Sequence, residues 1–181
     1  MINLFRGGAD QGIAPSQAAK LQCILCYFHT YFKEGAFMTS AVDESSLIRS
    51  CIGRNGVVRI ERMVGGSFDE VAWESDTSLL GEFIVKDGAI EDGSSNSLHV
   101  DFANKKIGGG VLGMGSVQEE IRFVVSPELI ASLMVLPDME ANEAVYIRGC
   151  EKFSVYAGYG KTFRFTGRHT DRSYNKELYV A

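Results

Sequence analysis

The stretch LHVDFANKKIGGGVLGMGSVQEEIRF, residues 98–123, decides how the rest of the chain is organised. Apolar and polar residues alternate from Leu98 to Phe102, which is the period of a half-buried strand. Five glycines follow within residues 108–115, where the backbone can adopt positive φ angles and approach a bound group without a Cβ in the way. The stretch therefore predicts a strand that leads into a flexible glycine loop.

A helix is expected directly after the glycine loop. Ser116 and Glu119 have the spacing of a capping box, which predicts a helix that begins at Val117. The adjacent carboxylates Glu119 and Glu120 then lie in its first turn, at the mouth of the loop. Acidic residues are common in first helical turns because they complement the helix dipole, so a capping role stays open beside a catalytic one.

Three motifs in this stretch resemble, in order and spacing, the signature of the poly(ADP-ribose) glycohydrolases. They are DFAN at 101–104, GGG at 108–110 and QEE at 118–120. The catalytic domain of that family is an elaborated macrodomain. The resemblance implies an α/β fold with a macrodomain-like mixed sheet flanked by helices. It also implies a helical accessory segment at residues 1–55 and part of the catalytic domain at residues 56–181.

The function implied by this resemblance is a glycoside hydrolase that cleaves the ribose–ribose bonds of poly(ADP-ribose) and releases ADP-ribose. Glu120 would act as the general acid/base at the scissile bond. Glu119 would hold the ribose hydroxyls, and Asp101 would orient the ribose and the catalytic glutamate. The implied substrate-binding residues are Ile90, Glu91, Asn104, Gly108, Gly109, Gly110, Gln118 and Tyr159.

Three of these binding residues match motifs of the family outside the central stretch. Ile90 and Glu91 match an isoleucine–glutamate pair that contacts the adenine ring, although two ordinary loop residues are the alternative. Tyr159 matches the second tyrosine of a tyrosine-x-glycine-tyrosine loop, which packs on the bound ADP-ribose. A tyrosine suits that place because its ring stacks while its hydroxyl finds a polar partner.

The expected partners are poly(ADP-ribose), ADP-ribose and poly(ADP-ribosyl)ated proteins, and the implied chemistry requires no metal or other cofactor. The net charge of −5 argues against a broad basic surface, so direct DNA binding is not expected. The sequence shows neither a signal peptide nor an apolar run of about 18 residues, which is the length needed to span a bilayer. We therefore expect an intracellular protein, in the nucleus or the cytoplasm, without a membrane partner.

Hydrophobic periodicity and the positions of glycine and proline predict the remaining elements. A helix is expected at residues 16–33, with an apolar face of Leu21, Ile24, Leu25, Phe28 and Phe32. Strands are expected at 56–64, at 83–85 before a turn at 87–88, at 144–147 and at the end of the chain, and a helix at 126–136. Strands that alternate with helices favour an α/β sheet.

Two further patterns have both a structural and a functional interpretation. Cys23 and Cys26 form a CxxC, but they lie in a helical apolar pattern and are expected to be core residues rather than zinc ligands. Arg164, Arg168 and Arg172 are spaced by four, so a helix would place them on one face. That face would either bind a polyanion or be solvated.

Three other functions stay open from the sequence. The first is an ADP-ribose-binding macrodomain that does not cleave, since the glycine-rich diphosphate loop that the family has further along has no counterpart in these residues. The second is a structural or regulatory segment. The third, a dinucleotide-binding Rossmann domain, is weaker because the loop lacks a matched GxGxxG.

Overall fold

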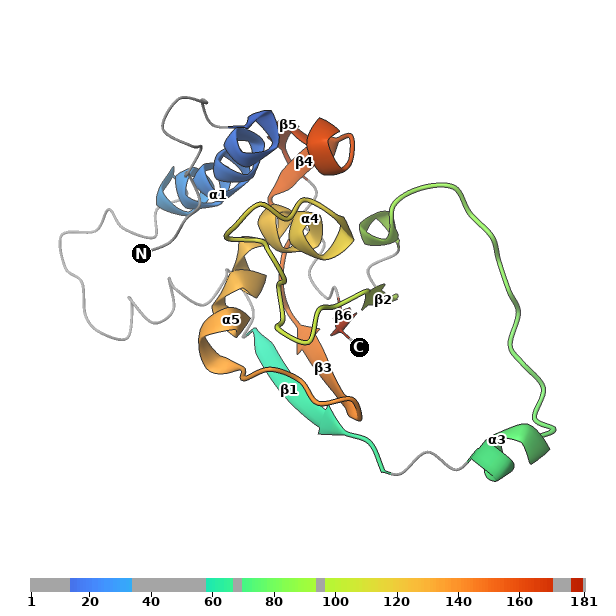
Figure 1. The fold of residues 1–181 in the computed structure, drawn as a ribbon. Helices are drawn as coiled ribbons and strands as arrows, with labels where there is room; N and C mark the ends of the chain where they lie inside the picture. Colours follow the sequence, from blue (N-terminus) through green and yellow to red (C-terminus); the bar gives the residue numbers. More distant parts are fainter. Residues whose placement is uncertain (1–13, 34–57, 67–69, 94–96, 171–176, 181) are drawn as a thin grey trace.

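A computed structural model describes residues 14–33, 58–66, 70–93, 97–170 and 177–180 of the 181-residue chain. Figure 1 shows how the elements follow one another. In chain order they are α1 (Pro15–Lys33), β1 (Arg59–Val64), α3 (Glu70–Ser75), η1 (Ile90–Asp92), β2 (Leu98–Asp101), α4 (Gln118–Val125), η2 (Pro127–Ala131), α5 (Ser132–Val135), β3 (Glu143–Arg148), β4 (Ser154–Ala157), η3 (Gly160–Thr162), β5 (Arg164–Arg168) and β6 (Glu177–Val180).

The main sheet has four strands in the order β1-β3-β6-β2. The pairs β1–β3 and β3–β6 are antiparallel, whereas β6 and β2 are parallel. Ile147 of β3 pairs with Ile60 on one side and with Leu178 on the other. The predicted mixed sheet is therefore confirmed, and β4 and β5 form a separate antiparallel pair.

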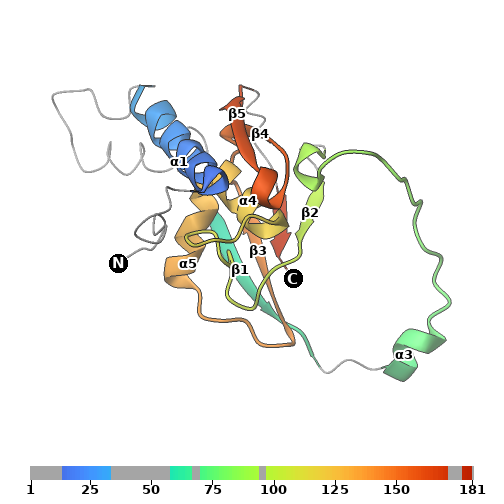
Figure 2. The ribbon, with the colours of Figure 1, turned by 45° about the horizontal axis from the view of Figure 1, so that its top comes forward.

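The hydrophobic core lies between β3 and the helices α1, α4 and η2. Helix α4 packs against both α1 and η2. Helix α1 also contacts the β4–β5 pair, beside which it lies in Figures 1 and 2. The buried apolar side chains of this cluster include Ala19, Cys23, Ile107, Val111, Ile121, Phe123, Val124, Val125, Leu129, Val145, Ile147 and Phe163. Because α4 is buried along almost its whole length, its first turn is fixed in place by the core.

Several sequence predictions hold with small changes. The helix expected at 16–33 is α1, the strand at 56–64 is β1, and the strand at 144–147 lies within β3. The helix expected at 126–136 forms as η2 followed by α5, and the last strand forms as β6. Within the described residues, no helix combines the length and the apolar content needed to cross a bilayer.

The strand predicted at 83–85 is wrong. This segment has no regular structure, and its side chains are exposed, with Val85 at 97%. Among the described strands none pairs with it, so its β-branched residues have no sheet to join. Figures 1 and 2 show the chain from α3 to η1 as an arc that extends away from the other elements. Trp73, which the sequence did not place, is 72% exposed in α3.

Strand β2 alternates as predicted, but its buried face is the polar one. His99 and Asp101 are 2% and 1% exposed, whereas Leu98 and Val100 are about half exposed. Asp101 interacts electrostatically with the buried guanidinium of Arg122 on α4. The polar face of the strand is therefore turned toward the helix that carries the glutamates.

The predicted apolar face of α1 is also wrong in part. The buried residues of the helix include Ala19, Lys20 and Cys23, whereas Leu25 and Phe28 are 54% and 47% exposed. The helix approaches the glycine loop through this face of small side chains and one lysine. Its cysteines are free thiols.

The arginine triplet does not lie on a helix. Arg164 and Arg168 belong to strand β5, whose register against β4 shifts between them, and both are exposed. Arg172 and the fourth cysteine, Cys51, lie outside the described residues.

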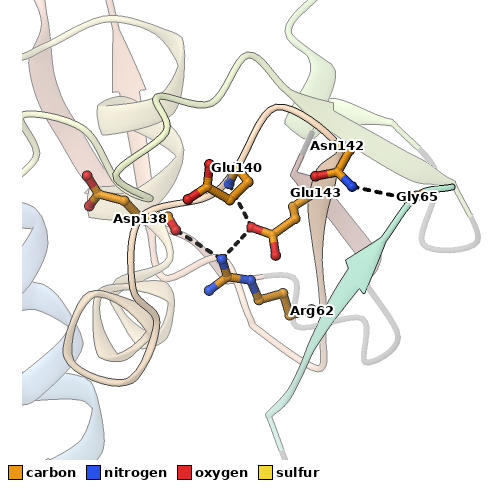
Figure 3. Close-up of polar contacts among 6 residues, drawn as sticks. All are labelled: Arg62, Gly65, Asp138, Glu140, Asn142 and Glu143. Atoms are coloured by element: carbon orange, nitrogen blue, oxygen red, sulfur yellow. Dashed lines mark hydrogen bonds and ion pairs between the residues drawn. The ribbon is translucent and has the colours of Figure 1, made fainter. Parts of the chain in front are cut away.

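A group of polar and charged residues connects β1 to the first residue of β3 and to the segment before it (Figure 3). Arg62 forms an ion pair with Glu143 and donates a hydrogen bond to the carbonyl oxygen of Asp138 at 3.0 Å. Glu143 also accepts the backbone N–H of Glu140 at 2.6 Å. The hydrogen bond from Arg62 is the main cause that lowers the pKa of Glu143.

We expect Arg62→Met to lower the urea midpoint of unfolding slightly near pH 7 and to have less effect near pH 3. Because Arg62 lowers the pKa of Glu143 in the folded state, the stability from this pair is present at neutral pH. It is lost as the pH falls and the carboxylate binds a proton. Arg59→Met, which removes the exposed pair with Glu61, is the matched control and should change little. Equal losses at both pH values would contradict the prediction.

Candidate functional site

The chain between β2 and α4 forms a series of tight turns around the glycines. The N–H of Val111 donates to the carbonyl of Gly108 at 2.9 Å, and the N–H groups of Gly113 and Gly115 donate to the carbonyl of Gly110 at 2.8 and 3.1 Å. Gly108 and Gly109 have φ angles of +79° and +47°, which disfavour any residue with a side chain. The predicted glycine loop is thus an ordered, folded loop. Below, "glycine loop" means residues 108–115.

The two glutamates at the start of α4 bind the backbone around this loop. Glu119 accepts the N–H of Gly108 at 2.6 Å on one carboxylate oxygen and the N–H of Asn104 at 3.0 Å on the other. Glu120 accepts the N–H groups of Gly110 and Val117, both at 2.9 Å. Each carboxylate oxygen therefore has one backbone donor and retains further acceptor capacity.

The two carboxylates converge, although adjacent helical residues point about 100° apart. A Cβ added to Gly109 would lie 2.7 Å from Oε2 of Glu119 and 2.8 Å from Oε1 of Glu120. A Cβ on Gly115 would collide with the carboxylate of Glu120. The absence of side chains at these positions lets both acids approach one short piece of backbone, which the sequence alone could not establish.

The helix begins one residue later than predicted. Its first residue is Gln118, Val117 is the N-cap, and the side chain of Glu120 reaches back to the Val117 N–H. The expected Ser116–Glu119 capping box is therefore wrong, because Glu119 binds the chain before the glycine loop instead. Glu120 takes the capping hydrogen bond, and both glutamates are buried, at 4% and 7% exposure.

Gln118 connects three parts of the site. Its side-chain oxygen accepts the Phe102 N–H at 2.9 Å, and its side-chain nitrogen donates to the Val100 carbonyl at 3.3 Å. Its backbone N–H donates to the hydroxyl of Tyr159 at 3.1 Å. The ring of Tyr159 is 56% exposed beside the start of α4, so it is free to stack on a ligand.

The predicted adenine pair is divided between surface and interior. Ile90 is 40% exposed in η1, whereas Glu91 is 6% exposed and accepts a short hydrogen bond from the hydroxyl of Tyr156. Tyr156 is the first tyrosine of the loop that contains Tyr159, and its role was not foreseen. The two tyrosines therefore contact different ends of the site. Tyr156 donates a hydrogen bond to Glu91, and Tyr159 accepts one from the first residue of α4.

Burial shifts two acids of the site, Asp101 and Glu119, toward the protonated form. Burial, followed by the nearby charge of Glu119, raises the pKa of Asp101 to about 7, while Arg122 acts in the opposite direction. Burial also raises the pKa of Glu119, against the effect of its two backbone N–H donors. A carboxyl group that can hold a proton near neutral pH, as Asp101 can, suits a site of proton transfer.

Two buried cations beside the site, Arg122 and Lys20, were missed by the sequence analysis, and Lys20 contacts the glycine loop directly. Lys20 of α1 is fully buried, and its ammonium group donates to the carbonyls of Val111, Gly113 and Gly115 at 3.0, 2.6 and 2.7 Å. A usable signal was present, since small or polar residues recur at Ser16, Ala19 and Cys23 with helical spacing on the same face as this lysine.

The predicted site residues thus fall into two groups. Asp101, Asn104, Gly108, Gly109, Gly110, Gln118, Glu119, Glu120 and Tyr159 are joined through the hydrogen bonds and charge interactions described above. Ile90 and Glu91 lie on η1, from which Glu91 interacts electrostatically with Arg122. Over the described ranges, no group of three His, Cys, Asp or Glu side chains is placed to hold a metal ion.

Comparison with known proteins adds an independent observation. Residues 70–179 match the family model described as "Poly (ADP-ribose) glycohydrolase (PARG), Macro domain fold". The chain is 42% identical over 158 residues to poly(ADP-ribose) glycohydrolase 1 of Arabidopsis thaliana, which is 87% of this chain and 26% of that protein.

Two further relatives match shorter parts. A probable poly(ADP-ribose) glycohydrolase 2 of Arabidopsis thaliana is 50% identical over 104 residues, 58% of this chain and 19% of that protein. Poly(ADP-ribose) glycohydrolase 1 of Caenorhabditis elegans is 37% identical over 107 residues, 59% of this chain and 14% of that protein. The chain spans about a quarter or less of the length of these relatives. With its macrodomain-type mixed sheet and this family match over more than half of its length, the chain belongs to the poly(ADP-ribose) glycohydrolase family.

Proposed function

We propose that this chain carries a glycosidase site that hydrolyses the ribose–ribose bonds of poly(ADP-ribose) and releases ADP-ribose. The observation that carries the proposal is the convergence of two buried carboxylates, Glu119 and Glu120, on the backbone of Gly109. Hydrolysis of a glycosidic bond passes through an oxocarbenium-like transition state. It needs a proton donor at the leaving oxygen and an activated water, and carboxyl groups fixed beside a sugar can supply both.

In this mechanism Glu120 is the general acid/base. It gives a proton to the leaving ribose oxygen, and the carboxylate that results takes a proton from the attacking water. Its two hydrogen bonds, from Gly110 and Val117, fix the orientation of the carboxyl group before substrate binds. Such preorganisation avoids reorientation during the reaction.

The neighbouring polar groups orient the sugar. Glu119, placed by the N–H groups of Asn104 and Gly108, has lone pairs left for ribose hydroxyls. Asp101 lies within the electrostatic reach of Glu119, which supports a role in orienting the ribose and the acids. Gln118 would bind the sugar from the same helical turn, and the glycines at 108–110 would let it approach the backbone.

The adenosine end of the substrate would lie against η1 and the tyrosine loop. Ile90 offers exposed apolar surface for the adenine ring, and the exposed ring of Tyr159 offers a stacking surface. Glu91 would accept a hydrogen bond from the exocyclic amine of adenine. It has lone pairs available for this beside the one that accepts from Tyr156. Poly(ADP-ribosyl)ated proteins would be the macromolecular substrates, in the nucleus or the cytoplasm.

A second candidate is an ADP-ribose-binding domain that does not cleave. It is favoured by the fact that each oxygen of Glu119 and Glu120 already accepts a backbone N–H, as expected of groups that only hold a loop. In that case the glutamates would shape a binding site and transfer no proton.

Two measurements on the wild-type chain separate these candidates. Isothermal titration with ADP-ribose reports binding, and release of ADP-ribose from purified poly(ADP-ribose) reports cleavage. The enzyme proposal expects saturable binding and release of ADP-ribose. Binding without release would favour the non-cleaving domain, and a flat titration from a cooperatively folded sample would reject both.

A further inference from the structure

The glycine loop is wrapped around a single ammonium group. Lys20 donates hydrogen bonds of 3.0, 2.6 and 2.7 Å to the carbonyls of Val111, Gly113 and Gly115, and the Gly110 carbonyl lies 3.5 Å away. An ammonium group has three N–H donors, and three close carbonyls match that number. The side chain is fully buried, so these carbonyls take the place of water.

The lysine and the catalytic glutamate hold opposite sides of the same loop residues. Gly110 directs its N–H to Glu120 at 2.9 Å, while its carbonyl faces Lys20. Gly115 accepts from Lys20, and its Cα lies so close to the Glu120 side chain that an added Cβ would collide with it. Any displacement of these two glycines therefore displaces the surroundings of Glu120.

The charge of Lys20 is compatible with this position near neutral pH. Burial lowers the pKa of Lys20 to about 8, and the Glu120 carboxylate acts in the opposite direction. The carbonyl oxygens stabilise the protonated form by hydrogen bonds, which are stronger when the donor is charged. A neutral apolar residue of the same length would leave the buried carbonyl of Val111 and the part-buried carbonyls of Gly113 and Gly115 without this donor.

We propose that Lys20 is a positioning residue for the glycosidase site: from α1 it holds the glycine loop in the shape that places Glu120 against the substrate. The proposal rests on the function proposed above and assigns a role to a helix distant in sequence from the catalytic motifs. Lys20 does not touch the substrate; it acts through the loop backbone. A preorganised site is sensitive to such a support, because a misplacement of about 1 Å can cost about 100-fold in rate.

The test compares Lys20→Met with Lys105→Met in the full chain. Lys105 has a side chain that is 75% exposed and pairs with Asp138 at 3.7 Å, so the control removes a lysine charge near the same loop without removing its support. Two properties are measured at a temperature where thermal melts show both variants folded. One is kcat for ADP-ribose release, and the other is the amide spectrum of protein labelled with ¹⁵N only at its 20 glycines.

We expect Lys20→Met to shift or broaden the loop glycine signals and to lower kcat by about 100-fold. Lys105→Met should leave the signals of Gly110 and Gly115 and the rate close to wild type. A purely stabilising role of Lys20 would reduce the folded fraction but leave kcat per folded molecule unchanged. Loop glycine signals that coincide with wild type, or a kcat within twofold, would overturn the proposal.

A second variant keeps the test possible when the first one does not fold. If Lys20→Met does not fold, Lys20→Gln retains two N–H donors without the charge, and the same two readouts apply. The glycine spectrum also separates this proposal from the function on which it rests. A wild-type chain that releases no ADP-ribose contradicts the proposed function, whereas the response of the loop glycines still decides whether Lys20 holds the loop.

Discussion

Replacing Glu120 by glutamine is expected to lower kcat for ADP-ribose release by about 1,000-fold, within the range seen when a general acid/base is lost. Glutamine keeps the size of the side chain and one of its oxygens, so it can still accept a backbone N–H from Gly110 or Val117. It cannot transfer a proton to the leaving oxygen. The affinity for ADP-ribose should therefore remain within a few-fold of wild type.

The two quantities are measured separately, by single-turnover release of ADP-ribose from the polymer and by isothermal titration. Glu128→Gln is the matched control, since Glu128 also accepts a backbone N–H, from Glu151 at 2.9 Å, but lies in η2 rather than beside the glycine loop. The control should turn over like wild type. Turnover of Glu120→Gln at a rate close to wild type would remove Glu120 from the acid/base role.

The parts of the structure that the sequence predicted well are those with strong local signals. The strand and the glycine loop of residues 98–115 were found because alternation and five glycines leave few alternatives. The helix after the loop was predicted from a capping box, and it forms although its capping contact comes from Glu120. The mixed sheet followed from the family resemblance of the same stretch, and the other elements followed from periodicity and turn residues along the chain. The placement of Glu119 and Glu120 in the first turn of α4 was likewise predictable.

The features that were missed depend on contacts between distant segments. Residues 83–85 have strand-like composition, but a strand needs a neighbour, and none of the described strands pairs with them. The buried face of β2 is polar because α4 faces it, which alternation alone cannot show. Lys20 was overlooked for the same reason, since its partners lie about 90 residues away in the sequence.

The clearest consequence of the buried charges should appear in the pH dependence of stability. Burial raises the pKa of Asp101 from 3.8 to about 7 in the folded state. Between these values the folded chain binds more protons than the unfolded chain, so the free energy of unfolding falls as the pH rises. Above about pH 7 the Asp101 carboxylate is ionised while buried in the folded state. The contribution of this group to the free energy of unfolding is then at its lowest.

We therefore expect Asp101→Asn to be more stable than wild type near pH 8, by up to about 4 kcal/mol, and to differ little from wild type near pH 4. Urea unfolding at a series of pH values measures this. Asp87→Asn, at an exposed position, is the control and should follow the wild-type curve. Some pH dependence should remain in Asp101→Asn, because burial also raises the pKa of Glu128 to about 7.

The same variant links stability to function. If the role of Asp101 is to orient the ribose and the neighbouring glutamates, Asp101→Asn should release ADP-ribose more slowly than wild type. It should do so even though it is more stable than wild type near pH 8. A loss of activity together with a gain of stability would show that the buried carboxylate is retained for chemistry at a cost to the fold. A variant that is less stable than wild type near pH 8 would contradict the argument, because the carboxylate would then be favourable where it lies.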